Sequence, residues 1–217
     1  MADVSISIKA YKTIQKKIND KKKGAEQVFK ALASDATKRV PGWVSTEVAK
    51  EYGVKKTEIT GKKIGSVKVN GSQLKDLKFV YTGRRLTPTH FSMNPKAPSA
   101  SYTLKAAIIK GKRTTLGKVK KLTKKQRQAI GKNFTKSGTQ RSDHSPIMLM
   151  HTGNAQSEGT NYIPFQRKSK DRKDVEVIRT VSLPQMVSSK RTQVGIQKAM
   201  TEGLQKRLDH HTKRYMG

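Results

Sequence analysis

The residues that most often carry acid–base or metal chemistry form no recognisable catalytic set in this sequence. The closest carboxylates, Asp171, Asp174 and Glu176, are interleaved with lysines and arginines. This mixture is typical of a salt-bridged loop that leads into a strand, and a metal-dependent nuclease site is the alternative. His210 and His211 are adjacent, and neighbouring side chains on a helix point about 100° apart, so we expect them to be surface or interface residues. We therefore predict no metal ligands and no catalytic residues.

The sequence also lacks the usual nucleophile and nucleotide motifs. Cysteine is absent, which excludes thiol chemistry, disulfides and cysteine-based metal sites. Three Gly-Lys pairs are followed by Arg113, Val119 and Asn133, where a phosphate-binding loop requires Ser or Thr to hold magnesium. No Gly-x-Ser-x-Gly elbow occurs. We expect a protein that is not an enzyme and that needs no cofactor.

The charge of the chain is its most unusual property. The 217 residues include 47 Lys and Arg against 15 Asp and Glu, a formal net charge of +32. No acidic residue occurs from Leu77 to Ser142, a stretch of 66 residues that holds 17 basic ones. A chain this charged repels itself, so we expect a partner that supplies negative charge or buried surface.

Within this acid-free stretch the basic residues are densest between Lys105 and Arg141, where interspersed glycines favour a mobile loop or a hairpin over a packed helix. We call residues 110–145 the basic loop and expect it to contact DNA phosphates or an acidic protein surface; a merely solvated surface is the alternative. Its candidate contact residues are Lys110, Lys112, Arg113, Lys118, Lys120, Lys121, Lys124, Lys125 and Arg127.

Apolar periodicity predicts an α+β fold. Residues 1–23 resemble an arm, a short strand followed by a basic linker, and residues 24–217 are expected to form one domain. Helical spacing starts at Gly24, is interrupted at Pro41-Gly42 and resumes up to Gly53. This pattern predicts either one long helix kinked at Pro41 or two helices in series.

The rest of the chain predicts a central antiparallel sheet and a C-terminal helix. After Gly61, apolar and polar residues alternate with a period of two, which predicts strands, and Asn70-Gly71 is a turn signal between them. A mobile loop is expected at 153–159. Further strands are predicted at 101–109, 146–150 and 175–181. From Pro184 we predict an amphipathic helix of about two dozen residues. Its apolar stripe, Val194, Met200, Leu204 and Leu208, would hold the subunit or its assembly together.

Apolar runs in the chain are short, and the first twenty residues lack an apolar signal core, so neither a membrane span nor secretion is expected.

Several segments, in their order and spacing, resemble the prophage minor tail protein Z family of tailed bacteriophages. The resemblance covers about residue 25 to the end. It is carried by Trp43 and Val48 running into Glu51-Tyr52-Gly53-Val54-Lys55-Lys56, by Gly83-Arg84-Arg85-Leu86-Thr87-Pro88-Thr89-His90-Phe91 and Asn94-Pro95-Lys96, by Met150-His151-Thr152-Gly153, by Ser182-Leu183-Pro184-Gln185-Met186, and by Lys206-Arg207-Leu208-Asp209-His210-His211. The family usually has an unbroken first helix, which Pro41-Gly42 interrupts here.

The resemblance implies a virion structural protein that completes the head-proximal end of a long tail, with no catalytic residues. Together with the charge, it leads us to expect a homo-oligomeric ring with sixfold symmetry. We expect this ring to assemble in the host cytoplasm and to be located in the tail or neck of the virion. The expected partners are the tail tube or tail terminator, the head connector and phage DNA in the channel, and no membrane. The alternative is a sequence-nonspecific nucleic-acid-binding protein of the ribosomal or chromatin type.

Overall fold

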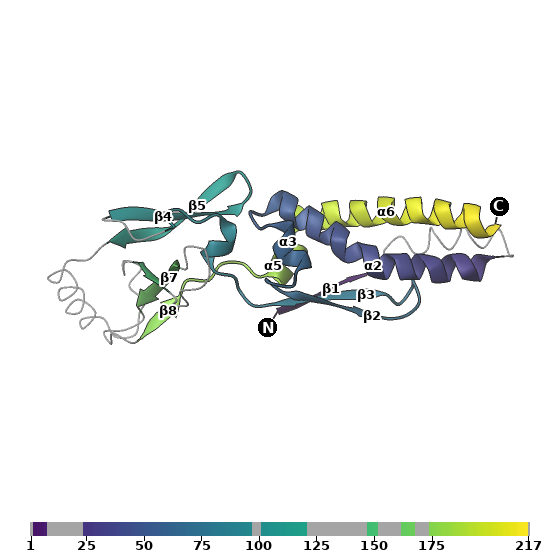
Figure 1. Ribbon diagram of the computed structural model, residues 1–217, viewed down its shortest axis with the longest axis horizontal. Coiled ribbons are helices and arrows are strands. Elements are labelled where there is room, and N and C mark those ends of the chain that lie inside the picture. Colours follow the sequence, from purple (N-terminus) through teal and green to yellow (C-terminus); the bar gives the residue numbers. More distant parts are fainter. Residues whose placement is uncertain are drawn as a thin grey trace. The chain divides into compact units, whose positions relative to one another are not determined.

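The computed structural model describes residues 2–7, 24–96, 101–120, 147–151, 162–167 and 174–216 (Figure 1). They form helices and small antiparallel sheets, which confirms the predicted α+β class. The chain divides into two compact units. Unit 1 comprises Met1–Arg84 and Val181–Gly217, and unit 2 comprises Arg85–Thr180. Residues 24–217, for which we predicted a single domain, run through both units: the chain leaves unit 1 after Arg84 and returns to it at Val181. That the two units behave as one domain stays a prediction.

Unit 1 is built around the long helix α2, Ala25–Glu51, which is followed by the short helix α3, Lys56–Thr60. Helix α2 begins after Gly24, whose φ of 86° falls in the left-handed region that glycine adopts easily. Its buried face repeats every four residues, because residues four apart lie on one side of a helix. The fully buried members are Val28, Leu32, Ala36, Val40, Val44 and Val48.

Pro41 lies inside α2, so one continuous helix forms and the alternative of two helices in series is wrong. Proline has no N–H to donate to the carbonyl four residues earlier, and this usually bends a helix. Two side chains bond carbonyls near this point. The Ser45 hydroxyl donates to the Pro41 carbonyl at 2.6 Å, and the Thr46 hydroxyl donates to the Gly42 carbonyl at 2.9 Å. The ribbon of α2 changes direction part-way along its length (Figure 1).

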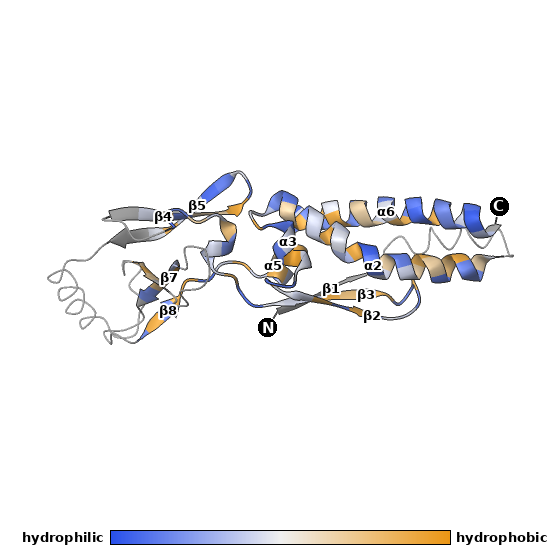
Figure 2. Cartoon of the chain, viewed as in Figure 1, coloured by the Kyte–Doolittle hydropathy of each residue, from blue (hydrophilic) through white to orange (hydrophobic). Residues whose placement is uncertain are grey.

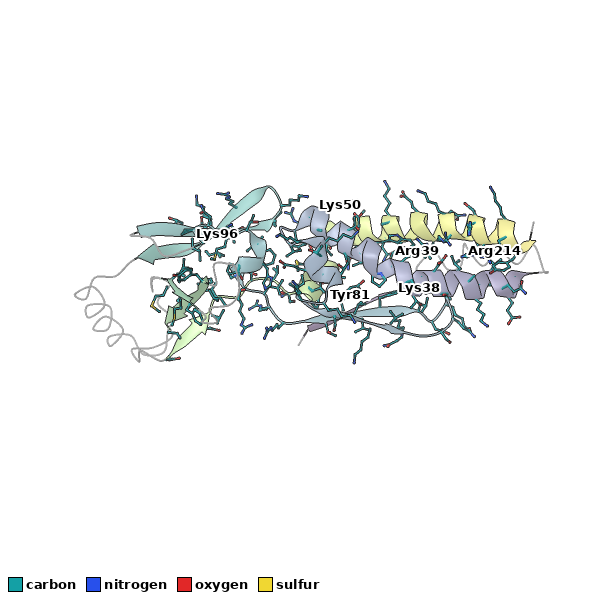
Figure 3. All side chains as sticks on the ribbon, in the orientation of Figure 1. Lys38, Arg39, Lys50, Tyr81, Lys96 and Arg214 are labelled. Carbon is teal, nitrogen blue, oxygen red and sulfur yellow. The ribbon has the colours of Figure 1, made fainter. Side chains whose placement is uncertain are left out.

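A three-stranded antiparallel sheet forms the second layer of unit 1. Its strands are β1, Ala2–Ser7, β2, Ser66–Asn70, and β3, Lys78–Gly83, in the order β1-β3-β2. The strand predicted in the N-terminal arm is therefore confirmed as β1, while residues 8–23 lie outside the described part. Phe79 and Tyr81 on the central strand are buried (Figure 3 labels Tyr81). Gly71 follows β2 with a φ of +94°, at the position of the predicted turn.

The C-terminal region forms two helices, not the single one predicted from Pro184. Helix α5 spans Leu183–Ser188 and α6 spans Lys190–Met216, with Ser189 extended between them. A capping box starts α5: the Gln185 N–H donates to the Ser182 hydroxyl, and the Ser182 N–H donates to the Gln185 side-chain oxygen at 2.9 Å. The hydroxyl of Thr192 donates to the Met186 carbonyl at 2.5 Å across the break, which ties the first turn of α6 to α5.

Helix α6 buries a regular seam at four-residue steps: Thr192, Ile196, Met200, Leu204 and Leu208. Three of the four predicted stripe residues belong to this seam. Val194 does not, because its side chain is 75% exposed. It precedes Ile196 by two residues, which places it about 200° around the helix, on the opposite face.

The two long helices lie side by side and antiparallel (Figure 1), with alternating polar and apolar surface along each (Figure 2). Two glycines of α6 mark their closest approach. A Cβ placed on Gly203 would lie 2.5 Å from the Trp43 ring, and one placed on Gly195 would lie 2.7 Å from a Glu47 carboxylate oxygen. The side chains of Trp43 and Glu47 on α2 therefore occupy space that α6 leaves open at these two glycines.

In the part of unit 2 that the structure describes, most residues lie in β-strands. Its elements are the 3₁₀ turn η1, Pro88–Phe91, and the strands β4, Ser101–Ile109, β5, Lys112–Lys120, β6, Met148–His151, β7, Tyr162–Arg167, and β8, Val175–Val177. Strands β4 and β5 form a hairpin, and the other three form a sheet in the order β6-β7-β8. A small core of Met93, Leu104 and Ile147 holds them together. The single central sheet that we predicted is in fact three small sheets spread over two units.

The strand predictions in unit 2 are partly correct. The strand predicted at 101–109 is confirmed, and that at 146–150 forms at Met148–His151. The strand predicted at 175–181 ends at Val177. Strand β7 was not predicted, because Pro164 argues against a strand interior. The mobile loop predicted at 153–159 lies outside the described residues.

The α6 seam makes a paired stability prediction. Leu204→Ala removes a fully buried side chain and should lower the free energy of unfolding by about 2–5 kcal/mol. Val194→Ala removes an exposed one and should change it by less than about 0.5 kcal/mol. Urea unfolding followed by circular dichroism measures the free energy of unfolding of both variants. Equal losses in the two variants would contradict the assignment of Leu204 to the buried seam.

The two glycines make a second paired prediction. Gly203→Ala forces a methyl group against the Trp43 ring and should destabilise the protein by about 1–3 kcal/mol. Gly195→Ala meets only the end of the flexible Glu47 side chain, so its higher helix propensity should leave stability unchanged or raise it by up to about 1 kcal/mol. Thermal unfolding of both variants tests how α2 and α6 are aligned against each other. If Gly195→Ala lowers the stability more than Gly203→Ala does, this alignment is wrong.

Candidate nucleic-acid interface

The first part of the basic loop is a tight β-hairpin. Strands β4 and β5 pair antiparallel, with Ile109 opposite Lys112, and Lys110-Gly111 forms the two-residue turn between them. Gly111 has a φ of +78°, a conformation that glycine adopts without steric cost. The glycine-punctuated sequence predicted a loop or a hairpin, and for residues 110–120 the hairpin is the outcome.

The hairpin has an apolar inner face and a polar outer face. Leu104 and Ala106 are fully buried, whereas Lys105 and its cross-strand partner Thr115 are exposed. Gly117 permits a close approach to Ile147, since a Cβ at Gly117 would lie 2.7 Å from the Ile147 Cδ1 atom. The core of unit 2 therefore anchors the inner face and leaves the basic outer face to solvent.

The structure describes only some of the predicted contact residues. Lys110, Lys112 and Arg113 lie at the turn and are exposed. Lys118 and Lys120 lie in β5, where only their backbone is described. Lys121, Lys124, Lys125 and Arg127 lie outside the described residues. The part that can be placed is thus a solvated basic turn.

Unit 2 is strongly positive. Its 96 residues carry 21 basic and 5 acidic side chains, so its net charge is 21 − 5 = +16, half of the +32 of the whole chain. Exposed charges of one sign act together within the Debye length, about 8–10 Å at physiological salt. Such a surface attracts polyanions without selecting their sequence.

The predicted assembly residues Met200, Leu204 and Leu208 are buried inside unit 1. Their role within the subunit follows from this burial, because the seam packs against α2 of the same chain. A role of these residues between subunits stays a prediction.

A polar cluster that no sequence pattern predicted joins α2 to the last turns of α6. Asp35 accepts a hydrogen bond from Arg207 and lies 2.8 Å from His211 Nε2, and Arg39 Nε lies 3.5 Å from its other carboxylate oxygen. The two histidines differ: His210 is exposed, as expected of a surface residue, but His211 is buried. Figure 3 labels Arg39 on α2.

The electrostatics of Asp35 give this cluster a defined pH dependence. Burial raises the pKa of Asp35, but the hydrogen bonds from Arg207 and His211 and their charges lower it by more, so its pKa lies below the usual 3.8. A carboxyl group with a lowered pKa in the folded protein contributes stability above about pH 4. That contribution is lost as the pH falls through the folded-state value.

Asp35→Asn tests this cluster. The variant should lose about 1–3 kcal/mol of unfolding free energy at pH 7, because it replaces charged hydrogen bonds with weaker neutral ones. The wild type should lose more stability than the variant between pH 4 and pH 2, since only the wild type still has the carboxylate to protonate. Urea unfolding at a series of pH values measures both effects, and parallel pH profiles would contradict the assigned role of Asp35.

The described residues give no support to the metal-dependent nuclease site that the sequence left open as an alternative. Asp174 and Glu176 flank the start of β8, Asp171 lies outside the described part, and no group of three or more His, Cys, Asp or Glu placed to hold a metal ion occurs in the ranges given above. Within those same ranges, no helix is long and apolar enough to cross a membrane.

Comparison of the chain with protein-family models, with curated proteins and with solved structures finds no match in any of the three.

Proposed function

We propose that this protein is a structural component of a tailed-bacteriophage virion, a tail-completion or neck protein. It would assemble as a homo-oligomeric ring with sixfold symmetry. This ring would lie between the tail tube or tail terminator and the head connector. Phage DNA would pass through the ring and meet its basic surface. The resemblance to the minor tail protein Z family motivates this proposal.

The observation that carries the proposal is the concentration of uncompensated positive charge in unit 2. A basic hairpin turn, Lys110 to Arg113, stands exposed on an apolar core in a stretch that contains no acidic residue. A channel that conducts DNA needs a surface of this kind, positive, rigidly supported and without base-reading groups. Seventeen basic residues in 66 also exceed what one protein interface usually pairs.

Unit 1 fits the role of the folded body of such a subunit. It has its own core, in which α2 and α6 bury apolar seams against each other. Subunits with a modest core gain further stability from neighbours in a closed assembly.

The second candidate, a ribosomal or chromatin-type nucleic-acid-binding protein, is favoured by the same net charge. The position of the charge argues against it. Such proteins often carry their basic residues in long tails, whereas here the acid-free basic stretch, residues 77–142, includes the β4–β5 hairpin, whose inner face packs on a folded core.

The hairpin can be tested with two charge-matched variants. The hairpin variant carries Lys105→Gln, Lys110→Gln, Lys112→Gln and Arg113→Gln. Its control carries Lys30→Gln, Lys38→Gln, Lys206→Gln and Arg214→Gln, which are exposed residues of α2 and α6 with the same total charge. Figure 3 labels Lys38 and Arg214 of this control set.

The hairpin variant should bind duplex DNA more weakly than the control. The slope of log affinity against log salt should become shallower by about 0.9 for each DNA phosphate that the variant no longer neutralises, and binding should stay independent of sequence. Fluorescence anisotropy with two unrelated duplexes across a salt series provides the measurement. Equal binding by the two variants would show that the hairpin does not contact DNA.

Sedimentation velocity of the wild type distinguishes the two candidates. A tail-completion protein should form a discrete ring-sized oligomer, alone or with tail tube protein. A ribosomal or chromatin-type protein should remain a monomer that coats DNA. A wild type that stays monomeric under all these conditions and still coats DNA would contradict the ring.

A further inference from the structure

Unit 2 contains a cavity of about 170 Å³ that no predicted function uses. It is lined by Arg85, Gln166, Glu176, Val177, Ile178 and Arg179. Two of these residues are arginines that stand 94 positions apart in the sequence. Both are exposed, so the cavity is open to large ligands as well as to small ones.

Hydrogen bonds between two distant segments bring the arginines together. The Thr180 N–H donates to the Leu86 carbonyl at 2.7 Å, and the Thr180 hydroxyl donates to the same oxygen at 3.0 Å. One arm of the Arg179 guanidinium donates to the Arg85 carbonyl at 3.3 Å. The backbone positions of both arginines are therefore fixed by the pairing of the first and last residues of unit 2.

The cavity has a surplus of positive charge. Within the part of the chain that the structure describes, no acidic side chain forms an ion pair with Arg85 or Arg179. Glu176 also lines the cavity, but it has an interaction partner of its own. Arg85 and Arg179 both line this cavity, so their positive charges would attract an anion that enters it.

We propose that Arg85 and Arg179 form a phosphate clamp that holds a backbone phosphodiester of DNA. A guanidinium group matches phosphate oxygens with two parallel N–H donors, a geometry that lysine cannot offer. The cavity has about the volume of six water molecules in the liquid, enough for one phosphate group. Gln166 adds an amide to the lining, and the described lining residues include no aromatic side chain on which a base could stack, so they favour contact with a phosphate.

The clamp rests on the proposed DNA contact and makes it more specific. The lysines at the hairpin turn are solvated point charges that attract DNA from a distance. The two arginines are held by backbone pairing, so they fix one phosphate in place and set the position of the strand on unit 2.

The clamp is tested by substituting Arg85 and Arg179, with a control variant in which two other arginines are substituted. Arg85→Gln with Arg179→Gln should weaken duplex DNA binding about tenfold relative to Arg191→Gln with Arg214→Gln, two exposed arginines of α6. The salt slope should fall by about 1 more than in that control. Arg85→Lys with Arg179→Lys keeps the charge and should recover only part of the affinity.

A second pair of measurements separates the cavity from its charge. Val177→Trp fills the cavity and leaves both arginines, so it should weaken DNA binding if the phosphate enters the cavity and have no effect if charge alone acts. Circular dichroism shows whether this variant folds. If it does not, NMR titration of the wild type with inorganic phosphate replaces it. The Nε–H signals of Arg85 and Arg179 should then shift more than that of Arg191, and more with phosphate than with acetate.

The outcomes distinguish the clamp from the proposed function. If the wild type binds DNA and the Arg85/Arg179 variant loses no more affinity than its control, the clamp is wrong and the DNA contact stands. If the wild type does not bind DNA but phosphate shifts the two arginine signals selectively, the site is an anion site and the DNA contact fails. Equal shifts with acetate and phosphate would indicate an acidic protein surface as the partner and overturn the clamp.

Discussion

The packing of α2 against α6 is the interaction on which the rest of unit 1 depends. Each helix contributes buried residues at four-residue steps, and Gly195 and Gly203 allow α6 to approach the side chains of Glu47 and Trp43. This seam joins an early and a late part of the chain, so unit 1 is complete only when both are present. It leaves the whole of unit 2 as an insertion between Arg84 and Val181.

The net charge of +32 is divided equally between the two units, and each unit has its own apolar core. Unit 2 carries half of this charge on a small core around Leu104 and Ile147, and its strands expose basic residues on the side away from that core. Unit 1 builds its core from aliphatic side chains and places its Asp35 cluster between two helices. In both units apolar side chains form the core, and basic side chains are exposed where a partner could reach them.

Much of the local structure could be predicted because it depends on neighbours in the sequence. The α2 stripe and the strand at 101–109 each follow from periodicity, and the structure has both. Of the predicted Asn70-Gly71 turn, the structure has the left-handed φ at Gly71, while Asn70 still belongs to β2. Predictions were less successful where local signals conflicted. At Pro41 the sequence left one kinked helix and two helices in series both open, and the structure has one continuous helix. Strand β7 was not predicted, because it contains Pro164, although this strand pairs on both sides.

Sequence alone was enough to establish the α+β class and the size and position of the charge surplus, whereas the position of the turn at Lys110-Gly111 came from the structure. Tertiary contacts were needed to show that Val194 faces solvent, that His211 joins Asp35, and that Arg85 meets Arg179. The physical reason is distance along the chain. Periodicity reports which residues share a face of one element, but which face is covered, and which side chains meet across elements, depends on contacts between segments that lie more than ninety residues apart.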